Sequence, residues 1–354
     1  MPLRRQPGTT LPALPVEWRQ PALHPVYLRL LCAMLTQRGI DPEPMLARAQ
    51  LSRRLIDSDG ALIAYAPVQS LIATAVELSG CPWLGLSFGA AAQLHTHGNV
   101  GNAVIASATL EKALQTFTSY AHLRTRLVRF ALEQDAAVTH LRVLPAFDLG
   151  SGSGFVRDAL LVVVERMLEG LSGQRNCATR YQLPGARPPW ASRYAEFLNA
   201  RLEFDAPGWL TMTFDRQWLQ QACLTANAPA HLIALRECER ENHRIDHAAT
   251  LTQRVQSLLQ ACGEQFPAAQ QTARQLGLSP RSLYRRLADE STSFRNLVDA
   301  QRSDRACWLL MHTDLPVERI AERLGYADPS NFSRTFKRWK GMTPRTYRHH
   351  RSTS

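Results

Sequence analysis

Three side chains near the C-terminus have the types and spacing needed to contact a polyanion. They are Arg281, Tyr284 and Arg285, at positions i, i+3 and i+4, and this spacing places them on one face of a helix. An arginine can hydrogen-bond guanine O6 and N7, and a tyrosine offers both a hydroxyl and an apolar edge for the thymine methyl. The same arginines can instead hold phosphates, and the ring of Tyr284 can instead pack on a neighbouring helix. The pattern predicts a nucleic-acid contact, with base reading and phosphate contact both left open.

A second group of polar and basic residues follows about fifty residues later. Its members are Ser330, Asn331, Arg334 and Lys337. Asparagine can pair with adenine and arginine with guanine, although each of these side chains can also serve as a phosphate contact. Pro329 takes a position where a side chain able to read a base could have stood. The second group is therefore expected to read fewer bases than the first.

The elements that must position this second group are a pair of short helices. The first carries Ile320, Ala321 and Leu324 on one face and is expected to end at Gly325. Asp328 and Pro329 then supply an N-cap and a first helical residue. The helix that follows has an apolar face at i, i+4 and i+7, formed by Phe332, Phe336 and Trp339. Two short helices joined by a tight glycine turn, the second basic on its outer side, predict a helix-turn-helix.

The same arrangement occurs twice. Residues 272–277 (TARQLG) are echoed by residues 320–325 (IAERLG), and Ser279-Pro280 opens a helix in the first copy. The residues from Phe294 to about Met311 are predicted to form one helix between the copies, about 27 Å long at 1.5 Å per residue. Successive major grooves on one face of B-DNA lie about 34 Å apart. One domain of this kind is therefore expected to reach two adjacent grooves.

Residues 325–348, GYADPSNFSRTFKRWKGMTPRTYR, resemble the C-terminal signature of AraC/XylS-type transcription regulators. The Gly-aromatic turn, the Phe-Ser-Arg-x-Phe-Lys run and the Gly-x-Thr-Pro-x-x-Tyr-Arg ending occur in the family's order. The resemblance implies a sequence-specific regulator, with activation as the expected direction of control and repression left open. It also implies promoter or operator DNA and RNA polymerase as partners. A chain of this family is expected in the cytoplasm, on the nucleoid when bound to DNA.

The charge distribution agrees with a DNA partner for the C-terminal part. The 354-residue chain has a formal net charge of +11. Residues 251–354 hold 17 Lys and Arg against 9 Asp and Glu, a net of +8, whereas residues 1–250 hold 24 against 21, a net of +3. A basic domain attached to a nearly neutral body indicates a polyanion partner for that domain.

The N-terminal part has mixed periodicity, which predicts an α+β domain followed by an all-α domain with two helix-turn-helix motifs. Residues 127–145 are expected to form a hairpin turning at Gln134-Asp135, and residues 155–171 a strongly apolar helix. Within this part, HGNVGNAVIASATLEKAL (residues 97–114) resembles the subgroup of the same family with an arabinose-binding-type domain. That resemblance implies a domain that binds a small-molecule effector, which it does not identify, and that forms a homodimer.

The expected domain organisation has four parts. They are a disordered tail (1–21), a ligand-sensing and dimerisation domain (22–225), a linker (226–250) and a DNA-binding domain (251–354). The tail is rich in proline and carries arginines without an apolar core, which does not fit a signal peptide. No apolar run approaches the length of about 20 residues that a membrane span needs, so no membrane partner is expected.

Other candidate sites are weaker. The seven cysteines are scattered and form no Cys-x-x-Cys pair, which fits a reducing compartment and argues against a zinc site. His95 and His97 form a His-x-His pair without a third ligand at helical spacing. Residues 150–154, GSGSG, have neither a phosphate-loop nor a nucleophile-elbow pattern and are expected to be a flexible connection. The sequence therefore predicts no enzyme, metal or cofactor.

One alternative from another class is an enzyme fused to the same type of DNA-binding domain, such as a DNA-repair alkyltransferase. Such enzymes need a clustered zinc-binding cysteine set and a reactive cysteine in a Pro-Cys-His setting. Cys32 and Cys81 stand alone, and Cys81 precedes Pro82. A zinc assay distinguishes the two classes.

Overall fold

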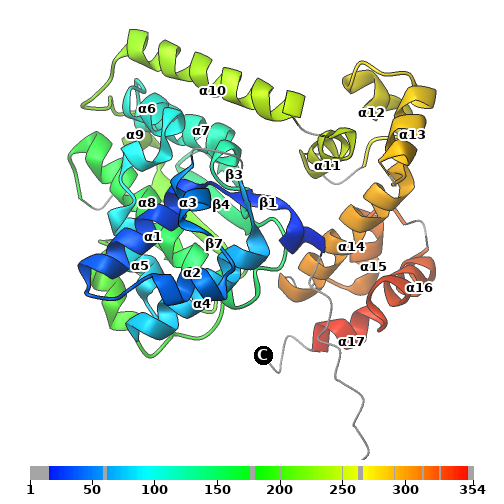
Figure 1. Cartoon of the computed structure of the whole chain (residues 1–354), viewed down its shortest axis with the longest axis horizontal. Coiled ribbons are helices and arrows are strands. Elements are labelled where there is room, and N and C mark those ends of the chain that lie inside the picture. Colours follow the sequence, from blue (N-terminus) through cyan, green and yellow to red (C-terminus); the bar gives the residue numbers. More distant parts are fainter. Residues whose placement is uncertain are drawn as a thin grey trace, which may run out of the picture.

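A computed structural model of the chain describes two domains joined by a long helix (Figure 1). The description covers residues 16–58, 62–175, 180–199, 201–248, 250–261, 266–290, 292–312, 315–326 and 328–349. The first domain mixes strands and helices, and the second is helical. The expected fold class, α+β followed by all-α, is confirmed.

A five-stranded sheet runs through the first domain in the order β3-β4-β7-β5-β6. β5 and β6 pair in parallel, and the other neighbours pair antiparallel. The strands are β3 (Val128–Gln134), β4 (Val138–Pro145), β5 (Arg180–Gln182), β6 (Arg201–Glu203) and β7 (Leu210–Asp215). A separate pair is formed by β1 (Pro21–Leu23) and β2 (Ile63–Ala64).

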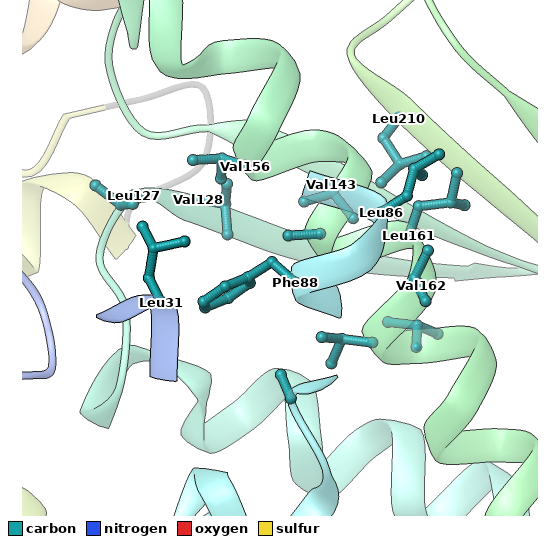
Figure 2. Close-up of a cluster of buried hydrophobic side chains, with 14 of the residues drawn as sticks. Leu31, Leu86, Phe88, Leu127, Val128, Val143, Val156, Leu161, Val162 and Leu210 are labelled. Carbon is teal, nitrogen blue, oxygen red and sulfur yellow. The ribbon is translucent and has the colours of Figure 1, made fainter. Parts of the chain in front are cut away.

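Helices cover this sheet and close the core of the first domain. The α-helices are α1 (Pro25–Gln37), α2 (Glu43–Arg48), α3 (Arg53–Asp57), α4 (Tyr65–Ser79), α5 (Leu84–Ala91), α6 (Asn99–Ile105), α7 (Leu110–Tyr120), α8 (Ser153–Ser172) and α9 (Arg216–Leu219). Short 3-10 helices lie between them: η1 (Val16–Arg19), η2 (Leu94–His97), η3 (Ala121–Leu123), η4 (Gly150–Gly152) and η5 (Ala191–Glu196). α8 is apolar on several sides because it is buried between α5 and the sheet, as Figure 2 shows for Leu161 and Val162 beside Leu86, Val143 and Leu210.

The hairpin predicted for this domain is confirmed, and α7 begins with a capping contact of the same kind. The hairpin of β3 and β4 turns at Asp135, whose carboxylate accepts hydrogen bonds from the backbone N–H groups of Ala137 and Val138, both at 2.8 Å. Thr109 is the N-cap of α7, and its hydroxyl accepts from the backbone N–H of Lys112 at 3.2 Å. Both are contacts in which a short polar side chain satisfies backbone donors that have no other partner.

Two expectations for the first domain need correction. The tail was expected to extend to residue 21, but η1 lies within it, β1 begins at Pro21, and Trp18 packs edge-on against Tyr65; residues 1–15 lie outside the described residues. The GSGSG stretch is not a free loop, because Gly152 is buried against the hydroxyl of Tyr65 and α8 begins at Ser153.

The expected linker, residues 226–250, is largely a helix. α10 (Ala228–Ala248) lies along α6, and Ala234 and Cys238 are buried against Val100, Ala103 and Leu123. The charged, weakly periodic composition suggested a linker, but only a narrow stripe of α10 touches the first domain. The polar side chains of residues 228–245 are exposed or half-buried.

The second domain has two small cores. Its helices are α11 (Leu251–Ala261), α12 (Ala269–Gln275), α13 (Pro280–Asp289), α14 (Phe294–His312), α15 (Val317–Arg323), α16 (Pro329–Lys340) and α17 (Pro344–His349). The N-terminal half of α14 packs in the first core with Leu283 and Leu287, and its C-terminal half packs in the second with Phe332 and Phe336. The prediction of one helix between the two helix-turn-helix copies is confirmed.

Within the described part of the chain, no single helix is both long and apolar enough to cross a bilayer. α4 and α5 meet these criteria only as a pair, with a bend of 107° between them.

Candidate nucleic-acid interface

α13 presents the first predicted group of side chains to solvent. Ser279 caps the helix, its hydroxyl accepting from the backbone N–H of Ser282 at 3.1 Å, and Leu283 and Leu287 are fully buried. The three predicted residues, Arg281, Tyr284 and Arg285, are exposed. The ring of Tyr284 is 53% exposed, so it is not packed on the neighbouring helix. The first group is thus free to contact a ligand outside the domain.

A carboxylate joins α13 to the rest of the first helix-turn-helix unit. Glu290, the C-cap of α13, accepts from the backbone N–H groups of Leu251 and Thr252 at 2.9 and 2.8 Å. These are the first N–H groups of α11, which have no partners within that helix. The bonds fix the end of α13 against α11 and so orient the outward face of α13.

α16 presents the second group. Asp328 caps it by accepting from the backbone N–H of Ser330 at 2.8 Å, and Phe332 and Phe336 are fully buried. Gly341 ends the helix at φ 76°, a conformation that favours glycine. The four predicted residues of this group are all exposed: Ser330, Asn331, Arg334 and Lys337.

The residues after α16 hold it in place. Tyr347 on α17 packs edge-on against Phe336, with ring centroids 5.4 Å apart. Arg348 donates to the backbone carbonyl of Leu315 at 2.5 Å, which ties α17 to the chain just before α15. The Thr-Pro-x-x-Tyr-Arg ending of the sequence therefore acts as a support for the second helix-turn-helix unit.

Asn331 has a different setting from the other members of its group. It lines a groove between α16 and α14, together with Tyr326, Arg302 and Arg338. Arg338 is exposed and lies one helical turn after Arg334, and it was not among the predicted site residues. The i, i+4 spacing from Arg334 was a signal that could have identified it.

α14 sets the distance between the two outward faces. Its 19 residues correspond to about 28 Å at 1.5 Å per residue. The buried side of α13 packs against its N-terminal half, and the buried side of α16 packs against its C-terminal half. The length of α14 is comparable to the spacing of about 34 Å between successive major grooves.

The buried side of α14 faces the first domain. Burial raises the pKa of the Asp304 carboxyl, as does the neighbouring carboxylate of Glu17, whereas Lys340 and Arg129 lower that pKa. These groups lie along a cleft that includes Trp18, Phe147 and Leu144 from the first domain. The first domain thus meets α14 away from the outward faces of α13 and α16.

The other candidate sites of the sequence do not form a reaction centre among the described residues. His97 is buried, and its Nδ1 lies 2.7 Å from the hydroxyl of Tyr27, whereas His95 is exposed. In the described ranges, no three His, Cys, Asp or Glu side chains are grouped as a metal site would require. The described cysteines are unpaired, and burial raises the pKa of the Cys223 and Cys238 thiols to about 11.

Comparisons with known proteins agree with this arrangement. The family described as the arabinose-binding domain of AraC transcription regulator, N-terminal, matches residues 39–223, and a helix-turn-helix domain family matches residues 272–350. The ornithine utilization regulator of Pseudomonas aeruginosa is 30% identical over 322 residues, which is 91% of this chain and 95% of that protein.

Two further proteins are similar to this chain over most of its length. The transcriptional regulator VirS of Mycobacterium tuberculosis is 27% identical over 331 residues, covering 89% of this chain and 93% of that protein. The crystal structure of the transcriptional regulator CdpR from Pseudomonas aeruginosa is 26% identical, covers 92% of this chain and 98% of that one, and has a TM-score of 0.47.

Two helix-turn-helix units at the ends of one helix, preceded by a separate α+β domain, define a DNA-binding transcription regulator of two domains. The chain belongs to the AraC family of transcription regulators. Because its relatives are regulators over nearly their full length, the chain is a regulator and not an enzyme, and the alkyltransferase alternative is set aside.

Proposed function

We propose that α13 and α16 enter two successive major grooves on one face of operator DNA. The observation that carries this proposal is that α13 and α16, which carry the two exposed groups, pack in two separate cores on the two halves of α14. The residues that would contact DNA are Arg281, Tyr284, Arg285, Ser330, Asn331, Arg334 and Lys337. Arg338, which flanks Arg334, joins them as a phosphate contact.

Within this set, we assign base reading to Arg285 and Arg334 first. Each points away from the pair of buried apolar residues on its own helix, so each would meet the floor of the groove. Tyr284 and Arg281 flank Arg285, and Ser330 and Lys337 flank Arg334, which suits contacts to thymine methyl groups or to phosphates. Asn331 faces the groove shared with α14, which suits a contact at the edge of the interface.

The first domain would control this binding in response to a small molecule. Its match to an effector-binding family and its attachment to the second domain through α10 support that role. Activation through contact with RNA polymerase, in the cytoplasm, is the proposed outcome. The relative from Pseudomonas aeruginosa is named for ornithine utilization, which makes ornithine one effector to test.

A homodimer is the proposed assembly. The apolar side chains of Leu224, just before α10, and of Leu232 and Ile233, in its first turns, are 72%, 56% and 62% exposed. A second copy of the chain would remove this apolar surface from water. Sedimentation of the chain beside a Leu232→Ser, Ile233→Ser variant tests this: a dimer that becomes a monomer supports the interface, and a wild-type monomer rules it out.

Selection of bound fragments from a random DNA pool tests the proposed function. The full chain should enrich two short conserved segments about one helical turn apart. A double variant, Arg285→Ala with Arg334→Ala, should enrich no such motif. Arg187→Ala, an exposed arginine of the first domain, is the matched control and should enrich the wild-type motif. If the wild type enriches nothing, or only one short segment, the two-groove proposal is wrong.

A further inference from the structure

The first domain contains a cavity of about 80 Å³ that residues of α1, α7 and α8, among others, line. Its walls are almost entirely apolar, and Figure 2 shows Phe88, Leu31, Leu127 and Val156 converging on this region. An engineered cavity of about 150 Å³ with similar walls stays dry and binds benzene. The cavity is therefore suited to a small apolar molecule, and a molecule the size of one ring would need the walls to move apart.

Most polar groups around the cavity already have partners. The guanidinium of Arg124 donates to the backbone carbonyl of His97 at 2.9 Å and to Glu241 at 3.3 Å. The hydroxyl of Thr125 accepts from the backbone N–H of Leu127 at 3.3 Å. Among the described residues that line the cavity there is no carboxylate, so the cavity does not suit an ammonium group such as those of ornithine.

His97 is the exception. It is 5% exposed and lines the cavity, and its Nε2 is buried without a hydrogen-bond partner among the described residues. Burial lowers the pKa of His97 to about 4, with a further contribution from the charge of Arg124, so the ring is neutral at pH 7. A neutral imidazole carries its proton on one nitrogen only.

The neighbour of His97 indicates which nitrogen carries that proton. Nδ1 lies 2.7 Å from the hydroxyl of Tyr27 and is the hydrogen-bond partner of that hydroxyl among the described residues. A buried hydroxyl is expected to donate, so the Tyr27 O–H donates to Nδ1 and Nε2 carries the N–H. Nε2 has almost no accessible surface, so the cavity offers this one hydrogen-bond donor only to a ligand that has moved its walls apart. A water molecule needs two or more polar partners, so an apolar molecule with one acceptor fits better.

The walls of the cavity are continuous with α10. Val100 lines the cavity and also belongs to the cluster that buries Ala234 and Cys238 of α10. Arg124 lines it as well and pairs with Glu241 of α10, with side chains 11% and 17% exposed. The guanidinium occupies space that a side chain at position 98 would fill, and Gly98 with φ 59° leaves that space open. Expansion of the cavity would therefore press on α10.

We propose that this cavity is the effector site, and that it binds a small, largely apolar molecule whose single oxygen acceptor receives the hydrogen bond of His97 Nε2. Binding is transmitted to the second domain through the contact of Arg124 with Glu241 and of α6 with α10. The proposal deepens the ligand control that forms part of the proposed function and rests on it.

Thermal unfolding of the full chain with two probes of equal heavy-atom count tests the site. Cyclohexanone has one oxygen acceptor, and methylcyclohexane has none. Cyclohexanone should raise Tm saturably, because it binds only the folded state, with an affinity about fivefold to tenfold higher than that of methylcyclohexane. The absence of a saturable rise with cyclohexanone would overturn the site, and equal binding of both probes would overturn the role of His97.

Variants locate the binding. In His97→Phe, the ratio of the affinity for cyclohexanone to that for methylcyclohexane should fall to about one. His95→Phe, which changes an exposed histidine nearby, should leave this ratio unchanged. Ala159→Leu narrows the cavity and should abolish stabilisation by both probes. Stabilisation that survives Ala159→Leu would place the probes elsewhere. If a variant does not fold, the wild-type comparison of the two probes still decides the proposal.

Coupling is measured on the DNA sequence selected above. Cyclohexanone should change the Kd of the full chain for this DNA, and Glu241→Gln should abolish that change while leaving the rise in Tm intact. A rise in Tm without a change of Kd in the wild type would overturn the coupling. A chain that binds no DNA either with or without the probe would instead contradict the proposed function, and the Tm result would be unaffected.

Discussion

Arg285 and Arg334 occupy the same place in two different helices. Each is the sixth residue of its helix, and in each helix the fourth and eighth residues are buried: Leu283 and Leu287 in α13, Phe332 and Phe336 in α16. The two arginines therefore project from their helices in equivalent directions, one from each helix-turn-helix unit. This equivalence is the structural basis for assigning both to base reading.

Removing Arg334 should weaken specific binding. Arg334→Ala is expected to raise the free energy of binding to the selected site by about 1–3 kcal/mol, the value of one good bidentate contact to a base. Arg334→Lys should recover only part of the loss, because a lysine cannot make the same bidentate contact. Gel-shift titration on the selected site and on random DNA measures both. An equal loss on random DNA would show that Arg334 contacts phosphate instead.

Two neighbouring residues on α16 should affect different properties: one the stability of the second domain, the other its affinity for DNA. Phe336 is fully buried and Lys337 is exposed. Phe336→Ala should lower the free energy of unfolding of the second domain by about 3–5 kcal/mol. Lys337→Ala should leave the free energy of unfolding nearly unchanged and lower the affinity for DNA. The affinity of this variant should also depend less on salt concentration, because one phosphate contact is lost. Urea unfolding followed by circular dichroism, beside gel shifts, checks both. A stable Phe336→Ala variant would contradict the packing of α16.

Residues 251–354 alone should bind the selected DNA, and the full chain should bind it more tightly. The fragment contains both small cores and both exposed groups, and the proposed dimer would add affinity by linking two such domains. Gel shifts with the two proteins at the same salt concentration measure the difference. Loss of all binding by the folded fragment would mean that the first domain contributes directly to the DNA interface.

A buried carboxyl should make the first domain less stable as the pH rises. Burial raises the pKa of Asp158, against smaller opposing effects of Arg157 and of the Tyr194 hydroxyl, which donates at 2.8 Å. The folded chain therefore holds this proton above the unfolded pKa of about 4, and ionisation at higher pH costs stability. Asp158→Asn should be more stable than the wild type at pH 7, with a difference that shrinks toward pH 4.

Urea unfolding across this pH range measures that difference. Asp205→Asn, at an exposed aspartate, is the control and should track the wild type at every pH. A difference for Asp158→Asn that does not depend on pH would show that the substitution acts through packing rather than through ionisation.

The helices of the second domain could be predicted from the sequence because their caps and apolar faces are formed by residues close together in the chain. Ser279 and Asp328 cap the helices that they were expected to cap, and the i, i+4 pattern of Phe332 and Phe336 identified the buried face correctly. Such contacts join residues close in the chain, so their spacing alone predicts them. The repeat then gave the second copy of the motif.

The features missed by the sequence analysis depend on contacts between distant residues. α10 is held by a narrow stripe around Ala234 and Cys238 that meets α6, more than a hundred residues earlier. The paired role of Tyr27 and His97, seventy residues apart, has no local signature. The spacing of residues within one segment cannot predict either contact. The linker was therefore interpreted without α6, and the His-x-His pair without Tyr27.

Breaking α14 should separate the two halves of the interface. Ala306 is fully buried near the middle of this helix, and Ala306→Pro removes a backbone hydrogen bond and kinks the helix. The variant should lose most specific affinity even where its first helix-turn-helix unit stays folded. Gel shifts beside circular dichroism check this. Wild-type affinity in the variant would mean that the spacing set by α14 does not matter.

Hydroxyl-radical footprinting of the full chain on its selected DNA tests the central claim most directly. One copy of the DNA-binding domain should protect two patches on a single face of the duplex, about one helical turn apart. Because α14 spans about 28 Å, less than the groove spacing, modest bending toward the protein should accompany this, at a cost of about 1–6 kcal/mol. Two phased patches are the predicted result, and a single short patch for each domain would contradict the two-groove account.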